Sequence, residues 1–409
     1  MCALGAGSGG AVLTVQRAGV TAVGGAVRFA TFNAAMFRTR PGLLAADLLA
    51  GDDPQACAVA ETIQRSRPDV LLLNEFDHDP DGVAAASFAW DYLAVGQRGA
   101  PPIEYRYAFT AAVNSGVPTG FDLDGDGTSD GPADAQGYGQ FAGQYGMLLL
   151  SRHPIETSRV RTFRQFRWKD MPGALLPTDP RSARPVDWFS GAALDVLRLS
   201  SRSHWDIPIT IGTSRVHLLA AHATPPLFDG PEQRNRMRNH DEIRFWVDYV
   251  SAGCGDYIYD DNGGYGGLPS YEPFVIAGDL NADPVDGFRL PGSISGLLDA
   301  DRVCDPMPGS TGGVLAALRQ FAGGRTHTGN PFHHTSDFGD EIFGNMRLDY
   351  VLPSTELRPL RHSVFWPPPA TGLSHLNGFS DHHLVWVDIL PGLPAPVSCR
   401  SDRAELDSR

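Results

Sequence analysis

The most informative stretch of the chain is Gly-Asp-Leu-Asn-Ala-Asp-Pro, residues 278–284. It follows an apolar run, residues 274–277, of the kind that forms a buried strand. Asp279 and Asn281 therefore lie where a core strand ends, and their spacing of two places them on one face. A carboxylate beside an amide donor suits a site that holds a hard cation and an oxyanion together. The alternative is a plain Asp/Asn turn.

Polar side chains stand at the ends of several other apolar runs. They are Asn33, Glu75, His222, Asp349, Asp381 and His382. If these ends meet at one edge of a sheet, they assemble acids for a divalent metal, amide donors and two histidines. One such residue would be an ordinary cap, but the whole set points to a site for phosphate ester chemistry.

The pieces that carry these residues follow one another in a recognisable order. They are Phe32-Asn33, Leu73-Asn74-Glu75, Ala221-His222-Ala223, Gly278-Asp279-Leu280-Asn281, Arg347-Leu348-Asp349-Tyr350 and Ser380-Asp381-His382. Together they resemble the endonuclease/exonuclease/phosphatase superfamily, over residues 27 to 390. The resemblance implies the deoxyribonuclease I-like fold, which is a four-layer α/β sandwich of two packed mixed β-sheets flanked by helices, with the site at one open edge.

The resemblance also implies a catalytic role for each residue. His382 would act as general base or acid on the attacking water, and Asp349 would orient its imidazole. Asp279 would position the water or a second metal. Asn281 and His222 would donate hydrogen bonds to the phosphoryl oxygens.

The same resemblance implies a metal at Glu75. This carboxylate would hold Mg²⁺ or Mn²⁺, with Asp381 and Asn33 nearby. Some relatives carry an acid two residues after the first Asn, where this chain has Ala35. A second metal at that corner is therefore not expected.

The chain reads as one catalytic domain, residues 26–392, between a leader at 1–25 and a flexible tail at 393–409. Apolar runs and breakers predict strands at 27–33, 69–75, 146–151, 206–212, 216–222, 273–279, 348–353 and 383–389. Helices are predicted at 54–65 and 231–250. Two Gly-rich inserts, 100–144 and 253–271, would be surface loops that rim the site.

A second metal site is expected in the first insert. Its residues match the spacing of a calcium-binding loop, with oxygen ligands from Asp122, Asp124, Asp126, Thr128 and Asp130. The glutamate expected at position 12 is missing, and Ala133 stands there. We expect a structural Ca²⁺, and the alternative is a cluster of acidic turn residues.

Three further polar clusters leave alternatives open. In residues 200–206, Arg202 or His204 would bind substrate phosphate. The alternative is a loop whose histidine and tryptophan side chains only pack. His333 and His334 would ligate metal or rim the pocket, but adjacent histidines face opposite ways on a strand, so a solvated loop is favoured. Arg234 and Arg238 share one helix face, for which solvent exposure is favoured over a substrate clamp.

Composition bears on the substrate. The chain has 33 Lys and Arg against 47 Asp and Glu, a net charge of −14. Because the sequence has no run of basic residues, the protein is not expected to bind a long polyanion along its length. A small-molecule or lipid phosphoester is the leading substrate, a secreted nuclease that cleaves nucleic acid is the closest alternative, and an inactive binding protein is disfavoured.

The remaining expectations concern partners and location. No apolar run is long enough for a transmembrane segment, and the protein is expected to be a monomer. Five cysteines without a CxxC pair argue against a zinc knuckle. Cys254 and Cys304 would pair if the protein is exported. Export is expected from the calcium loop and the Gly- and Pro-rich sequence, although no clear signal peptide begins the chain.

Overall fold

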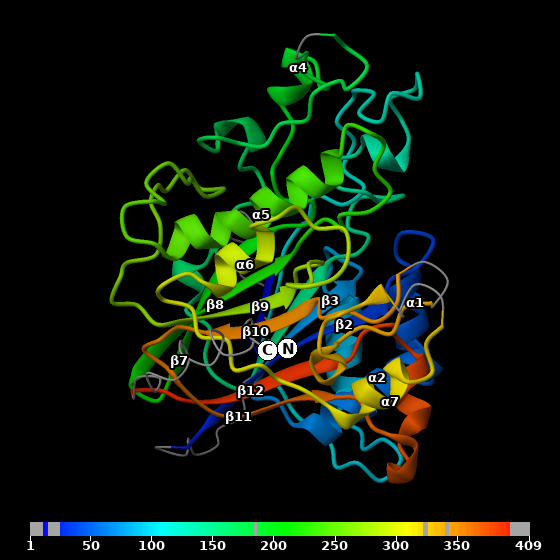
Figure 1. The fold of residues 1–409 in the computed structure, drawn as a ribbon. Helices are drawn as coiled ribbons and strands as arrows, with labels where there is room; N and C mark the ends of the chain where they lie inside the picture. The colour runs from blue at the N-terminus through cyan, green and yellow to red at the C-terminus, as the bar shows by residue number, and fades with distance from the viewer. Residues whose placement is uncertain (1–10, 15–24, 184–185, 322–325, 340–342, 393–409) are drawn as a thin grey trace.

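The computed structural model describes residues 11–14, 25–183, 186–321, 326–339 and 343–392 (Figure 1). Among them, twelve strands form two sheets. The first sheet runs β1 (Ala11–Thr14), β4 (Tyr107–Thr110), β5 (Met147–Ser151), β3 (Val70–Phe76), β2 (Val27–Met36), β12 (Leu384–Leu390) and β11 (Arg358–Phe365). The second runs β10 (Asp349–Pro353), β9 (Phe274–Asp279), β8 (Ser214–His222), β7 (His204–Ile211) and β6 (Arg161–Thr162).

Each sheet has one parallel pair at its centre. β2 pairs in parallel with β3, and β8 with β9, whereas the other pairs are antiparallel. In register, Asn33 lies opposite Asn74, and Asp279 lies between His222 and Asp349. The carboxyl ends of both parallel pairs therefore carry polar residues, as the sequence predicts.

The two sheets pack face to face, and helices cover both outer faces. Apolar side chains such as Phe29 and Leu72 from the first sheet meet Leu218 and Val275 from the second. α1 (Leu43–Leu49), α2 (Pro54–Ser66) and α3 (Val83–Ser87) cover the first sheet, and α5 (Arg234–Val250) and α6 (Ser293–Leu298) cover the second. The predicted four-layer sandwich is confirmed.

Shorter elements lie in the connections. A π-helical turn spans Phe88–Leu93, and α7 covers Thr311–Ala317. 3-10 turns span Pro132–Asp134, Thr157–Arg159, Trp168–Asp170, Pro331–His333, Pro369–Thr371 and Ser374–Gly378. The segments around α4 (Gly191–Leu194) form a lobe beyond α5 in Figure 1. None of the described helices is long and apolar enough to cross a membrane.

Local chemistry explains where the two long helices begin. The side chain of Asp53 accepts the Ala56 N–H, and Pro54 occupies the first turn of α2. α5 begins at Arg234 rather than at 231, because the Asp229 carboxylate accepts the N–H groups of Asn235 at 2.7 Å and Arg236 at 3.0 Å. This start places the first arginines of α5 beside the candidate site.

The central strands approach closely at Gly278. A Cβ on this residue, whose φ is +149°, would lie 1.8 Å from the Ala221 carbonyl oxygen. Only glycine therefore fits between β8 and β9 here, and it delivers the following Asp279 to the sheet edge.

Some expectations for the connections need correction. The first insert contributes strand β4, which pairs with β1, so Ala11–Thr14 within the expected leader joins the sheet. The second insert contains no helix or strand between Val250 and Phe274. Cys254 is free whereas Cys304 is disulfide-bonded, so the pairing of these two is wrong. Most of the leader and the tail lie outside the described residues.

Candidate active site

The carboxylate of Asp279 lies at the centre of the polar residues that gather at the sheet edge. Its Oδ2 accepts a hydrogen bond from Asn33 Nδ2 at 3.0 Å, and its Oδ1 accepts the Asn281 N–H at 2.9 Å. His222 Nε2 lies 3.5 Å from Asp279 Oδ2, and His382 Nε2 lies 3.7 Å from it. Residues from four strand ends thus converge as the sequence predicts.

His382 forms a buried dyad with Asp349. The Nδ1 atom of His382 lies 2.8 Å from Oδ2 of Asp349, and Thr335 donates its hydroxyl to the same oxygen at 2.7 Å. Burial opposes the imidazolium, but the Asp349 and Asp279 carboxylates outweigh it and hold the pKa of His382 well above its ordinary value. Phe338 packs edge-on against the His382 ring, 5.5 Å between centroids.

The carboxylate of Asp279 is unusually basic. Burial raises the pKa of Asp279 to about 7, and the charge of Asp349 adds to the rise while His382 opposes it. Burial also holds the pKa of His222 well below its usual value, and the charges of Arg202 and His382 reinforce this shift. His222 is therefore neutral, and its two carboxylate neighbours favour the tautomer with hydrogen on Nε2.

Glu75 lies on the other side of His222. Its Oε1 is 4.0 Å from His222 Nε2, and burial raises the pKa of its carboxyl group while Arg202 opposes the rise. Ser380 ties the two sides together, since its hydroxyl donates to the Asn33 carbonyl at 2.7 Å and accepts the His382 N–H at 3.0 Å.

Backbone strain gathers at this edge. Glu75, Asn281, Ala35 and Tyr145 have φ of 56°, 50°, 50° and 55°, in the left-handed region that side chains with a Cβ disfavour. Each such residue raises the free energy of the folded state by on the order of 1 kcal/mol or more. Strain retained at four positions around one site is typical of functional geometry.

The family model for the endonuclease/exonuclease/phosphatase family matches residues 30–382. The chain belongs to this family. Its members are metal-dependent hydrolases that act on phosphoester bonds, and the protein is an enzyme of that class. The expected resemblance is confirmed over nearly all of the described chain.

Solved structures of this family resemble the chain at low identity. An endonuclease/exonuclease/phosphatase from Beutenbergia cavernae is 16% identical with a TM-score of 0.48, over 90% of this chain and 72% of that one. TDP2 from Caenorhabditis elegans is 16% identical with a TM-score of 0.41, over 89% and 74%. A beta toxin from Staphylococcus aureus is 14% identical with a TM-score of 0.41, over 88% and 99%. A search of curated protein sequences found no match.

The donor set at Glu75 fits the divalent metal that the family uses. The half-buried carboxylate of Glu75, with the Asp381 carboxylate and the Asn33 amide nearby, offers the hard oxygens that Mg²⁺ or Mn²⁺ prefers. Asp279, Asp349 and His382 also have potential ligand atoms within 4.8 Å of one another. Within this group, a hydrogen bond already joins His382 to Asp349.

The predicted calcium loop has convergent oxygens. Asp122, Asp124 and Asp126 place a carboxylate oxygen each within 4.8 Å of one another, and Thr128 bonds Asp126. Asp130 is not in this group, and Asp134 instead accepts N–H groups within the loop. The loop offers at least three hard oxygens to a cation.

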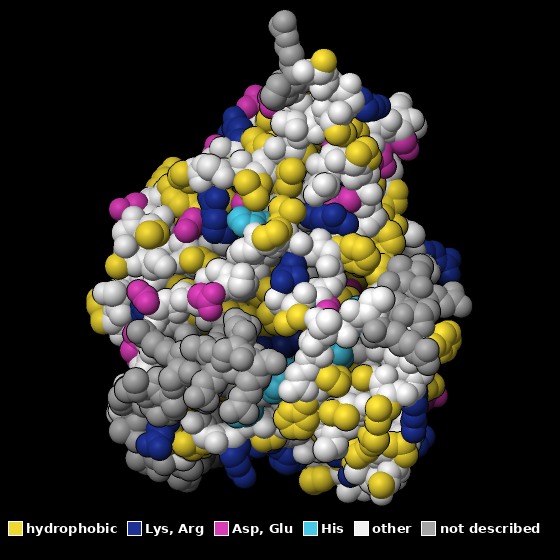
Figure 2. All heavy atoms as spheres, in the orientation of Figure 1, with side chains coloured by type: hydrophobic (Ala, Val, Ile, Leu, Met, Phe, Trp, Pro, Cys, Tyr) yellow, Lys and Arg dark blue, Asp and Glu magenta, His cyan; other side chains and the backbone are white. Residues whose placement is uncertain are grey.

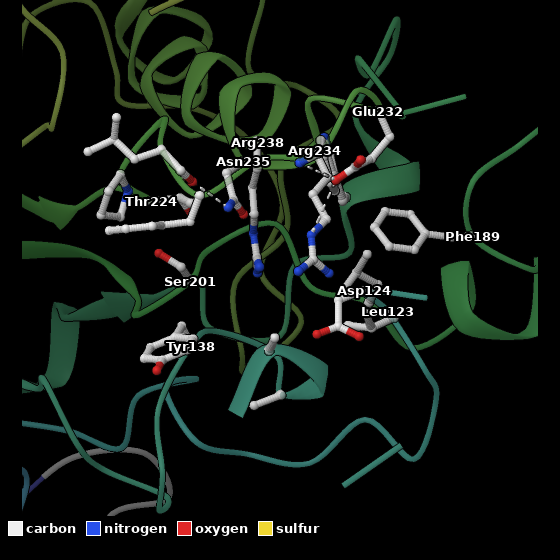
Figure 3. A pocket seen from close by; sticks show the side chains of 18 of the residues that line it. Leu123, Asp124, Tyr138, Phe189, Ser201, Thr224, Glu232, Arg234, Asn235 and Arg238 are labelled. Carbon is white, nitrogen blue, oxygen red and sulfur yellow. Dashed lines mark hydrogen bonds and ion pairs between the residues drawn. The ribbon is translucent and has the colours of Figure 1, made fainter. Parts of the chain in front are cut away.

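A cavity of about 840 Å³ opens beside the site and shares Glu75, Tyr145 and Arg202 with it. The first insert supplies one wall and the start of α5 the other (Figure 3). The second insert does not line it. Arg234 and Arg238 point into this cavity, so the expected solvated face of α5 is wrong for these two.

Two other expectations fail for identifiable reasons. His204 does not reach the site, because it is buried between Phe245 and Trp246 and its Nε2 lies 2.9 Å from the Glu242 carbonyl. His333 and His334 do not form a solvated loop, since His334 is buried and the segment supplies Thr335 to the dyad. Arg202 reaches the site, as predicted.

Asn281 is placed differently from expectation. Its side-chain Nδ2 donates to the Ala223 carbonyl at 3.1 Å, so only one amide hydrogen remains for a phosphoryl oxygen. Sequence reasoning assigned no role to Thr335 and favoured a solvated face for Arg238. Thr335 follows the His333-His334 pair, and Arg238 carries no local signal beyond its helix position.

Proposed function

We propose that the protein is a phosphodiesterase in which His382 activates the attacking water. The observation that carries the proposal is the dyad, with His382 Nδ1 2.8 Å from Asp349 and His382 Nε2 facing the open edge near Asp279. A base oriented in this way by a carboxylate is the arrangement that general-base hydrolysis needs.

The residues divide the work of the reaction. His382 takes a proton from water, and Asp349 stabilises the imidazolium so formed, which the raised pKa of His382 supports. Asp279, held by Asn33 and Asn281, orients the water. Neutral His222 donates from Nε2 to a phosphoryl oxygen. Glu75 with Asp381 and Asn33 would hold Mg²⁺ or Mn²⁺, which offsets charge on the phosphoryl group.

A small or lipid-like phosphoester is favoured over duplex DNA. A cavity of about 840 Å³ that is lined in part by apolar residues such as Trp168, Phe189 and Leu197 suits a compact organic group. The net charge is −14, and the face in Figure 2 shows Lys and Arg scattered among acidic and apolar side chains. A nuclease would need a continuous basic path for the phosphate backbone. Phe228, which is 84% exposed at the cavity mouth, suits an apolar substrate.

The experiment is a hydrolysis panel with Mg²⁺, Mn²⁺ or EDTA. Its substrates are plasmid DNA, RNA, sphingomyelin, bis-p-nitrophenyl phosphate and p-nitrophenyl phosphate. We expect metal-dependent cleavage of a small or lipid diester. Its kcat/KM should be higher than the kcat/KM for DNA, calculated per phosphodiester bond. Cleavage of plasmid DNA in preference to every small diester would overturn the substrate assignment.

We also propose that a structural Ca²⁺ occupies the Asp122–Asp126 loop and that the protein works as a monomer outside the cytosol. The convergent oxygens support the first proposal. The disulfide at Cys304 supports the location, because disulfides persist in oxidising compartments.

A further inference from the structure

Two arginines that line the cavity beside the active site have no directly paired carboxylate. Among the described residues, no carboxylate forms an ion pair with Arg202 or Arg238, although the chain as a whole is strongly acidic. Arg202 is only 5% exposed, and its Nε has no hydrogen-bond partner. The carboxylates of Glu75 and Glu242 influence them only from beyond ion-pair distance. Both guanidinium groups can therefore still pair directly with an anionic ligand.

Arg238 is fixed in place by the backbone. Its Nε and Nη2 donate to the carbonyls of Leu199 and Arg198, both at 2.8 Å, and Nη2 also contacts the Gln136 carbonyl. Its Nη1 makes no hydrogen bond with a described residue. The side chain of Arg238 points into the cavity, as Figure 3 shows. A guanidinium positioned beforehand loses little entropy when it binds an anion.

Arg234 adds a third positive charge from the same helix face. Its Nε lies 3.7 Å from Glu232 Oε1, which is longer than a hydrogen bond, so the pair is loose. Burial lowers the pKa of Arg238 to about 10, and the charges of Arg202 and Arg234 lower it further, whereas Glu242 opposes them. The three guanidinium groups thus repel one another across the cavity.

The cavity also has an apolar side, although the carboxylates of Asp124, Asp126 and Glu232 line it as well. Trp168, Phe189 and Leu197 form this side, and Arg202 lies close enough to interact electrostatically with both Glu75 and Arg238. A ligand that reaches Arg238 can therefore also extend to the phosphoester position. The ligand must be anionic at one end and apolar between its two ends.

We propose that the substrate's non-scissile half carries a second acidic group, a carboxylate or phosphate, which pairs with Arg238 and Arg234. Its apolar spacer packs against Trp168, Phe189 and Leu197. The substrate class is then a small amphipathic phosphodiester with two anionic ends. This inference rests on the proposed function, and it assigns to the cavity the part of the substrate that does not react.

The test uses p-nitrophenyl phosphodiesters whose second alcohol is an alkyl chain of increasing length, ending either in methyl or in carboxylate. At the best length we expect the wild type to favour the carboxylate by at least about tenfold in kcat/KM, the worth of one charged hydrogen bond. Arg238→Met should bring the ratio near one. Arg236→Met, on the same helix but not lining the cavity, should leave the ratio unchanged.

Equal or better cleavage of the methyl-ended esters by the wild type at every length would overturn the inference, and this comparison needs no variant to fold. If the wild type cleaves neither series, the proposed function fails. Calorimetric titration with each ester then decides the inference on its own. Tighter binding of the carboxylate ester, lost in Arg238→Met and kept in Arg238→Lys, supports it, and equal binding refutes it.

Discussion

The Nδ1 atom of His382 lies 2.8 Å from Oδ2 of Asp349, although the two residues come from segments that lead into different sheets. His382 directly precedes the β12 region of the first sheet, and Asp349 opens β10 of the second. The dyad therefore forms only when the sheets are packed in their correct register. Catalysis and the packing of the sandwich are linked through this one hydrogen bond.

Replacement of Asp349 by Asn should lower kcat by about 10²- to 10⁴-fold, since the amide removes the charge that stabilises the imidazolium. The variant should also shift the pH profile of kcat/KM to a lower apparent pKa, because the carboxylate no longer supports the charged form of His382. A pH–rate profile identical to that of the wild type would show that Asp349 does not act on His382.

Replacement of Glu75 by Gln should raise the Mg²⁺ concentration that gives half-maximal activity by about tenfold or more, because a neutral amide is a weaker ligand for a hard cation. The measurement is a titration of activity with Mg²⁺ at saturating substrate. Glu356→Gln, a surface change at a residue that pairs with Arg302, is the matched control. An unchanged titration in the Glu75 variant would place the metal elsewhere.

Calcium should stabilise the protein through the Asp122–Asp126 loop. Millimolar Ca²⁺ should raise the Tm of the wild type by several degrees, as expected for an ion that binds only the folded state. Asp124→Asn should abolish most of this rise while leaving the Tm in EDTA nearly unchanged, since Asp124 Oδ1 accepts only the Asp126 N–H. An equal rise in both proteins would mean that Ca²⁺ acts at another site.

His204 should make the protein less stable in mild acid. Burial lowers its pKa from 6.5 to about 4, with partial opposition from Glu242, so the unfolded state binds the proton more readily than the folded state. Its contribution is present above pH 6.5 and is lost as the pH falls toward 4. From pH 7 to pH 5 this residue should cost about 2 kcal/mol of unfolding free energy.

Urea unfolding at both pH values checks this loss. His204→Gln is expected to be less stable than the wild type at pH 7, because its side chain fills the space between Phe245 and Trp246 less well. It should nevertheless lose about 2 kcal/mol less between the two pH values. Parallel losses in the two proteins would show that His204 titrates normally.

The strand-end residues could be predicted from sequence because apolar runs mark buried strands, and each run ends where its polar residue begins. Asp279 and His222 are of this kind, and the sheet register confirms their proximity. No role could be predicted for Thr335, and Arg238 was expected on a solvated face, since their surroundings depend on long loops whose paths no local pattern specifies. His204 was misplaced because a histidine before a strand reads as polar, whereas its aromatic neighbours come from α5.

We propose that this edge hydrolyses phosphodiesters through His382 with a divalent metal. The most direct test measures kcat/KM for bis-p-nitrophenyl phosphate with the wild type and with His382→Ala, each in Mg²⁺ and in EDTA, after circular dichroism has shown that the variant is folded. We predict turnover only for the wild type in Mg²⁺, with a loss of at least about 10³-fold in each other case. Turnover by folded His382→Ala within about tenfold of the wild type would show that His382 is not the group that activates the attacking water.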